Sequence, residues 1–161
     1  MASSDFILEL DGIAGESQDK TFKGKIDIES FSWGVHNSGS MSAGGGGGAG
    51  KASFSDISFM KNVDLSSPKI AYHCASGAHI KKAILHVRKQ GKEQKEYYQI
   101  FLDDLIVSSF QSSAANGQPM VNESFSLNFT KIKFVYKEQK ADGSLGTAPE
   151  FHWDVKQNVG A

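Results

Sequence analysis

Hydrophobic and polar residues alternate along most of this chain with a period of two, which is typical of β-strands. Phe6, Leu8 and Leu10 form the first such run, and Asp11-Gly12 ends it as a turn. Later runs with the same period lie at 26–35, 52–60, 83–87, 97–107, 125–136 and 151–155. The pattern therefore predicts a mainly β protein with seven or eight strands.

The alternation changes phase at several places, and each change predicts a bend or a bulge. Ile26 and Ile28 are followed by Phe31 and Trp33, so the strand must bend near Glu29 and the residue after it. Further phase changes fall at 54–57 and 129–132. A sheet with repeated bends can curl around a core. We therefore expect a small β-barrel built of two sheets.

One segment, residues 66–77, has the features of a helix. It begins with serines as candidate caps, has Pro68 in the first turn and ends at Gly77. Ile70, Ala71 and Cys74 can form an apolar stripe that packs on the barrel. The sequence thus predicts one short flanking helix. Polar composition predicts loops at 15–24 and 108–118.

A glycine-rich stretch lies between the second and third hydrophobic runs. Gly44 to Gly48 are five consecutive glycines, which fit neither a helix interior nor a paired strand. The stretch is therefore expected to be a long extended loop. Such a loop is either a flexible linker or an arm that becomes ordered only against another subunit.

Composition narrows the range of functions. The 161 residues, 39% of them hydrophobic, fit a single domain over 1–161. Seventeen Lys and Arg balance 18 Asp and Glu, which indicates neither a nucleic-acid partner nor an acidic tail. A single cysteine, Cys74, excludes an internal disulfide. The N-terminus lacks a signal peptide and no long apolar run follows, so we expect cytoplasmic synthesis and no membrane insertion.

Candidate chemistry is sparse. The histidines have no spacing that favours a metal site, and they are His36, His73, His79, His86 and His152. Asp103 and Asp104 should point to opposite faces of a strand and interrupt it as solvated breakers. Gly50-Lys51 is followed by Ala52, which does not fit a phosphate-binding loop. We expect no catalytic centre, no metal and no cofactor.

Several short motifs, taken in order, resemble one family. They are Gly15-Glu16-Ser17, Ser30-Phe31-Ser32-Trp33-Gly34, Asn37-Ser38-Gly39-Ser40-Met41, Gly44 to Lys51, Ser67-Pro68, Gly77-Ala78-His79, Val107-Ser108-Ser109, Ser126-Leu127-Asn128-Phe129 and Gln139-Lys140-Ala141-Asp142-Gly143. This ordered set closely resembles the hemolysin-coregulated protein (Hcp) family, the tail-tube subunits of bacterial type VI secretion systems.

The resemblance implies a function and its partners. It implies hexameric rings that stack into a hollow tube, contacts with the spike and sheath of the secretion system, and secretion through that system without a signal peptide. It also implies that small effectors are carried in the lumen. The chain stops soon after the last predicted strand, so we expect no fused effector domain.

The resemblance also assigns residues. It makes an extended loop the contact between subunits or rings, formed by Ser38, Gly39, Ser40, Met41, Ser42, Ala43, Gly44, Gly45, Gly46, Gly47, Gly48, Ala49, Gly50 and Lys51. Ser30, Ser32 and Gly34 are candidates for the lumen wall, while Phe31 and Trp33 should pack inside the barrel. The alternative is a monomeric β-barrel that binds a ligand or hydrolyses a substrate, which would require a large enclosed apolar pocket.

Overall fold

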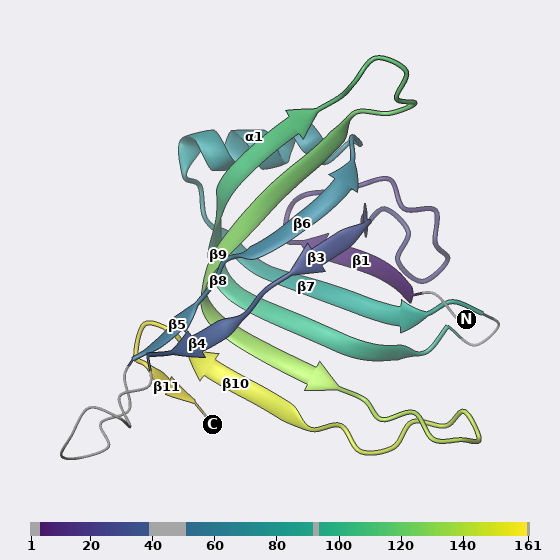
Figure 1. The fold of residues 1–161 in the computed structure, drawn as a ribbon, viewed down its shortest axis with the longest axis vertical. Helices are drawn as coiled ribbons and strands as arrows, with labels where there is room; N and C mark the ends of the chain where they lie inside the picture. Colours follow the sequence, from purple (N-terminus) through teal and green to yellow (C-terminus); the bar gives the residue numbers. More distant parts are fainter. Residues whose placement is uncertain (1–3, 39–50, 92–93, 161) are drawn as a thin grey trace.

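A computed structural model describes residues 4–38, 51–91 and 94–160 (Figure 1). Its elements in chain order are β1 (Ser4–Leu10), β2 (Ile26–Ile28), β3 (Ser30–Ser32), β4 (Val35–Asn37), β5 (Ala52–Phe54), β6 (Ile57–Asn62), α1 (Ser67–Ser76), β7 (Ile80–Lys89), β8 (Glu96–Ser113), β9 (Asn122–Tyr136), β10 (Glu150–Asp154) and β11 (Val159–Gly160). The predicted class, a mainly β fold of two sheets with one short helix, is confirmed.

The larger sheet is organised around two long strands. Its hydrogen-bonded order is β11-β10-β9-β8-β7-β1-β2, and β9 also pairs with β6, which pairs with β3. The first half of β9 lies beside β6, and its second half lies beside β10. The long strands β8 and β9 therefore belong to both walls of the curled sheet (Figure 1).

The two ends of this order meet at Glu29. β2 pairs with β1, whereas β3 pairs with β6, and one residue separates β2 from β3. The Glu29 backbone N–H donates to the Met60 carbonyl at 2.8 Å, which fixes the corner. The hydrogen-bonded order of the described strands is thus open, but a continuous bent chain joins its two ends. The bend predicted from the phase change is confirmed.

The interior of the curled sheet is filled by alternating side chains from each strand. Leu8, Ile26, Leu85, Ile100 and Leu127 are each at most 2% exposed. Aromatic side chains line the interior toward the arm, and they include Phe6, Phe31, Trp33, Tyr98 and Phe134. The Trp33 indole N–H donates to the Tyr98 hydroxyl at 2.8 Å, as its partly buried position requires. Phe31 and Trp33 therefore pack inward, as predicted.

Helix α1 covers one end of the barrel. Ile70 is fully buried against the sheet, and Gly77 ends the helix with a left-handed φ of 71°. The predicted serine cap is wrong in detail, because the Ser66 hydroxyl bonds to the Asp64 carboxylate at 2.5 Å and makes no cap hydrogen bond.

Two further expectations are wrong. Residues 108–113, predicted to be loop, continue β8, because pairing with β9 satisfies their backbone despite the polar side chains. Asp103 and Asp104 do not interrupt β8 either. Asp104 adopts a φ of 43° within the strand, a conformation that Asp tolerates better than most residues.

A buried ion pair joins α1 to the sheet. The Lys61 side chain is inaccessible to solvent, and its Nζ lies 2.7 Å from Glu123 Oε1 and 2.8 Å from Asp64 Oδ1. The Ser67 hydroxyl donates to Glu123 Oε1 at 2.6 Å. Buried charges need this kind of pairing and hydrogen bonding. The cluster therefore fixes the start of α1 against β6 and β9.

Candidate assembly surfaces

One face of the sheet β3-β6-β9-β8 is lined by small uncharged side chains. Lys61 and Glu123 point toward α1 from this sheet, so residues of the opposite parity point away from the helix. We call this surface the serine face. It consists of Ser30, Ser32, Ser58, Met60, Asn62, Ser109, Gln111, Ser113, Asn122, Ser124 and Ser126.

Strand register aligns these side chains in rows. Ser32 lies opposite Ser58, which lies opposite Ser126, and Ser126 lies opposite Ser109. The neighbouring row is Ser30, Met60, Ser124 and Gln111. The face therefore spans four strands with side chains that carry no formal charge.

Hydrogen bonds hold the hydroxyl groups of this face in place. The β8 bulge brings Ser108 and Ser109 together beside Ser126, with Oγ–Oγ distances of 2.7 and 2.6 Å. The Ser108 hydroxyl also donates to Asp56 at 2.6 Å, and the Asn128 amide donates to the same carboxylate at 2.7 Å. Asp56 thus anchors one margin of the serine face.

The structure brings together two of the three predicted wall residues. Ser30 and Ser32 are exposed on the serine face. Gly34 continues their alternation beyond β3, where its N–H and C=O bond to Ser55. Sequence reasoning missed the contributions of β6, β8 and β9. The signal was present at 124–129, where serines and Asn128 alternate with large apolar residues.

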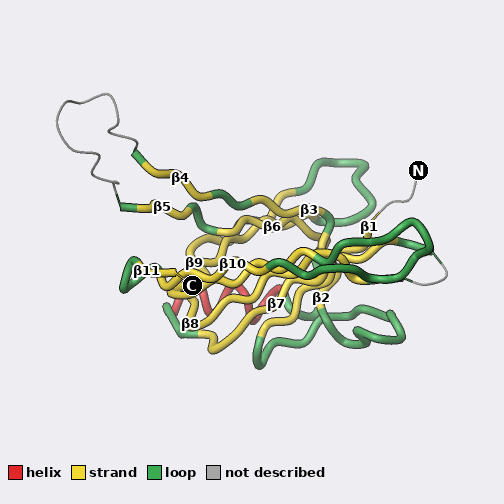
Figure 2. The backbone as a smooth tube through the Cα atoms, turned by 90° about the horizontal axis from the view of Figure 1, so that it is seen from below, coloured by secondary structure: helices red, strands yellow, loops and turns green. Residues whose placement is uncertain are grey.

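The predicted arm begins as a two-stranded sheet. β4 and β5 pair through Val35–Phe54, His36–Ser53 and Asn37–Ala52, and they extend away from the barrel (Figure 2). At the base of the arm, the Phe54 ring packs against Phe129, Phe151 and Trp153. Ser38 and Lys51 are exposed at its outer end, and Gly39 to Gly50 lie outside the described residues. The sequence thus located the arm but not its paired base.

Exposed apolar side chains gather in the loops next to β6, α1 and the β8–β9 hairpin. Val63, Leu65, Met120 and Val121 are 37 to 67% exposed, and the Val63 N–H donates to the Val121 carbonyl at 3.0 Å. We call these four residues the end patch. Figure 1 places the β6–α1 loop and the β8–β9 hairpin at the opposite end of the molecule from the arm. Exposed apolar residues of this kind mark contact surfaces.

Two strand edges flank the serine face. In the described residues, β3 has β6 as its one ladder partner, and β8 beyond Leu105 pairs with β9 alone. Their other edges thus have no ladder partner in the described chain. Unpaired strand edges can hydrogen-bond to another chain.

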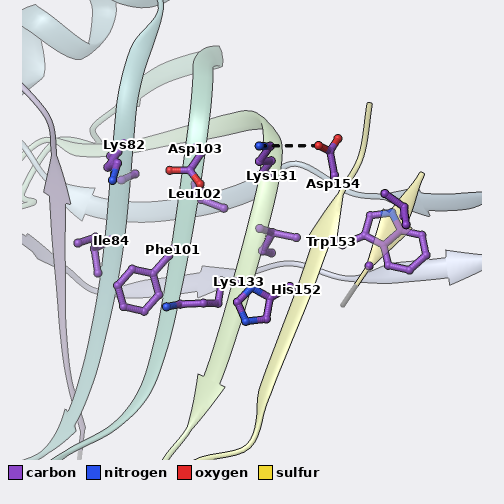
Figure 3. A pocket seen from close by; sticks show the side chains of 14 residues that line it. Lys82, Ile84, Phe101, Leu102, Asp103, Lys131, Lys133, His152, Trp153 and Asp154 are labelled. Atoms are coloured by element: carbon purple, nitrogen blue, oxygen red, sulfur yellow. Dashed lines mark ion pairs between the residues drawn. The ribbon is translucent and has the colours of Figure 1, made fainter. Parts of the chain in front are cut away.

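A separate cavity of about 670 Å³ lies open on the outer face of β7, β8, β9 and β10 (Figure 3). One row across it alternates in charge, through Lys82, Asp103, Lys131 and Asp154, with Lys131 Nζ 3.9 Å from Asp154. The next row is Ile84, Phe101, Lys133 and His152, and Lys133 lies over the Phe101 ring at 4.3 Å. Its lining includes no serine, threonine or cysteine that could act as a nucleophile.

The described residues offer neither a metal centre nor a membrane-spanning helix. Among them, no three His, Cys, Asp or Glu side chains are grouped so that they could hold a metal ion. In the same part of the chain, no helix has the length and apolar character needed to cross a membrane.

Comparison with known proteins connects these surfaces to a family. Residues 7–136 match the family described as "Type VI secretion system effector, Hcp". Over 159 residues, the chain is 42% identical to Protein hcp1 of Pseudomonas aeruginosa, covering 98% of both chains.

Solved structures agree. A type six secretion system protein superposes with a TM-score of 0.93 at 26% identity, covering 99% of this chain and 100% of that one. Hcp1 from Salmonella typhimurium superposes with a TM-score of 0.82 at 31% identity, covering 100% of both chains. The sequence match and the shared fold together show that this chain belongs to the Hcp family of type VI secretion proteins.

Proposed function

We propose that six copies of this chain form a ring, that rings stack into a hollow tube, and that the serine face lines the channel. The observation that supports this proposal is the serine face itself. Eleven adjoining side chains without a formal charge cover one side of a four-stranded sheet. Such a wall offers short polar groups and no ionic attachment points to a molecule that passes along it.

Ring closure requires a head-to-tail contact between two different surfaces of each subunit. The unpaired edges of β3 and of the last part of β8 lie at opposite margins of the serine face. If the β3 edge of one copy meets the β8 edge of the next, the serine faces join into one wall. The same contact covers two edges that would otherwise invite aggregation.

Stacking requires complementary surfaces at the two ends of the subunit. The arm projects from one end, and the end patch lies at the other (Figures 1 and 2). We propose that the arm of one ring contacts the end patch of the next. Glycine permits close approach of backbones at such a contact, and the contact offsets the entropy lost on ordering.

The tube in this proposal carries small secreted effectors in its lumen, contacts the spike and sheath, and leaves the cell through the type VI system without a signal peptide. It acts as a structural protein and not as an enzyme. The alternative, a monomeric ligand-binding or hydrolytic barrel, would place its site in the outer-face cavity. That cavity is open and its charged side chains alternate in sign, so it differs from an enclosed apolar pocket.

The mass of the purified protein in solution tests the proposal. Light scattering should give six times the subunit mass of 17.4 kDa, and electron microscopy of the same fraction should show rings. A monomer at every concentration, together with specific binding of a small molecule in the outer-face cavity, would favour the alternative.

A further inference from the structure

The loop between β1 and β2, residues 11–25, folds back on the outer face of the sheet. Its own backbone is held together by the hydrogen bonds Gly15 N–H to Gly24 O at 2.8 Å and Ser17 N–H to Lys25 O at 2.9 Å. It covers the outer side of β1, where Ile7 is 3% exposed. We call residues 11–25 the latch loop.

Phe22 is the main contact between the latch loop and β7. Its ring centroid lies 4.5 Å from that of His86, and the Arg88 guanidinium carbon lies 5.3 Å from the same ring. Arg88 also forms an ion pair with Asp19 of the loop, and its Nε lies 3.5 Å from Asp5 of β1. Two side chains of β7, both largely buried, therefore hold the loop.

His86 lies between two carboxylates from different strands. Its Nε2 is 2.9 Å from Glu9 of β1, and its Nδ1 bonds to Glu96 of β8. Glu9 is also 3.2 Å from the ammonium of Lys25 at the end of the latch loop. A neutral imidazole has one donor and one acceptor nitrogen, so it can donate to only one carboxylate. Only the imidazolium donates to both.

The electrostatic environment favours this charged form. Burial lowers the pKa of His86, but hydrogen bonds to Glu96 and Glu9 and the charges of these carboxylates outweigh burial and raise the pKa above its usual value. Burial likewise raises the pKa of Glu9, but its bonds to His86 and Lys25 outweigh this and lower it. Arg88 stays charged throughout the range in which His86 titrates.

The sign of the pH effect follows from the direction of the shift. A histidine whose pKa is raised in the docked state stabilises that state fully below its unperturbed pKa of about 6.5. The stabilisation is lost as the pH rises through the raised pKa. Above that pH, one carboxylate faces a nitrogen lone pair, and Phe22 stacks on a neutral ring instead of a cation.

We propose that the latch loop is a pH-sensitive device, docked while His86 is a cation and loosened when His86 becomes neutral. This inference does not depend on ring or tube formation. Arg88 and Asp19 keep the loop attached at high pH, so the change is a loosening and not an unfolding. The loop leads directly into β2 and, past Glu29, into β3 of the serine face.

Nuclear magnetic resonance tests the proposal on the full-length protein. The His86 ring proton resonance should give a pKa above 6.5, and the amide protection factors of residues 17–25 should fall as the pH rises through that value. The expected fall is about tenfold for each unit by which docking raises the pKa. His86→Gln removes the titrating group, so its protection factors should be independent of pH.

Two variants make the outcome decisive. His79→Gln is the matched control, because His79 pairs with one carboxylate, Asp104, at an exposed site, and this variant should behave like the wild type. If His86→Gln does not fold, Glu96→Gln provides the test, since removing one carboxylate should lower the His86 pKa and reduce the pH dependence. A His86 pKa at or below 6.5, or protection factors that ignore its titration, would overturn the proposal.

Discussion

Lys61 is the residue whose environment departs most from what its chemistry prefers. Its side chain is inaccessible to solvent, and every contact of its ammonium group is with the backbone or side chains near the start of α1. The pair gives geometric definition to the junction of β6, β9 and α1. Period-two reading from Ile57 and Phe59 places Lys61 on the core side, so the sequence already contained a signal for this buried charge.

Replacing Lys61 by methionine should destabilise the fold by about 3–5 kcal/mol, because Glu123 would remain buried without its cationic partner. Urea unfolding at a fixed protein concentration measures the change. Lys131→Met is the matched control. Its side chain is 59% exposed and its ion pair spans 3.9 Å, so its loss should cost less than about 1 kcal/mol. Equal losses in both variants would contradict the assigned role of the buried pair.

At the scale of elements, the bent strand that forms β2 and β3 determines which side chains reach the serine face. The bend near Glu29 could be predicted because the hydrophobic residues change parity there. The extent of the face could not, because it depends on the register between β3, β6, β9 and β8, which are far apart in sequence. The pairing of 108–113 was missed for the same reason, since polar side chains conceal a strand whose backbone is satisfied by β9.

Ser32→Gln tests whether the serine face lines a channel. The substitution adds length at an exposed position, so the ring should keep its mass while cryo-electron microscopy shows new side-chain density projecting into the channel. Secretion of lumen-borne effectors should fall. Ser112→Gln is the control, because Ser112 is exposed on the opposite side of the same sheet. Density for the introduced glutamine side chain on the outside of the ring would exclude the proposed wall.

At the scale of the whole molecule, the arm and the end patch occupy opposite ends, which suits a subunit that repeats along an axis (Figure 1). The fold class and family were predictable because alternation and ordered motifs run along the whole chain. The end patch was not, since Val63 and Val121 approach each other only after β6 and β9 pair.

Deleting Gly44 to Gly48 should leave the ring intact and abolish stacking, because the arm would be too short to reach the next ring. Leu65→Ser combined with Met120→Ser should give the same result from the other end of the subunit, since it removes two of the four apolar side chains of the end patch. Sedimentation and negative-stain microscopy distinguish rings from tubes. Tubes of normal length in either variant would contradict the proposed contact.

The length of β8 and β9 also has a mechanical meaning. Both strands run without a break through the two walls of the barrel, paired from Tyr98 with Tyr136 to Ser113 with Asn122. A push applied to the end near the hairpin is therefore transmitted along covalent chain and a continuous ladder of hydrogen bonds, and not across side-chain contacts alone. A subunit built in this way is stiff along that direction, a property that suits an object driven lengthwise by force.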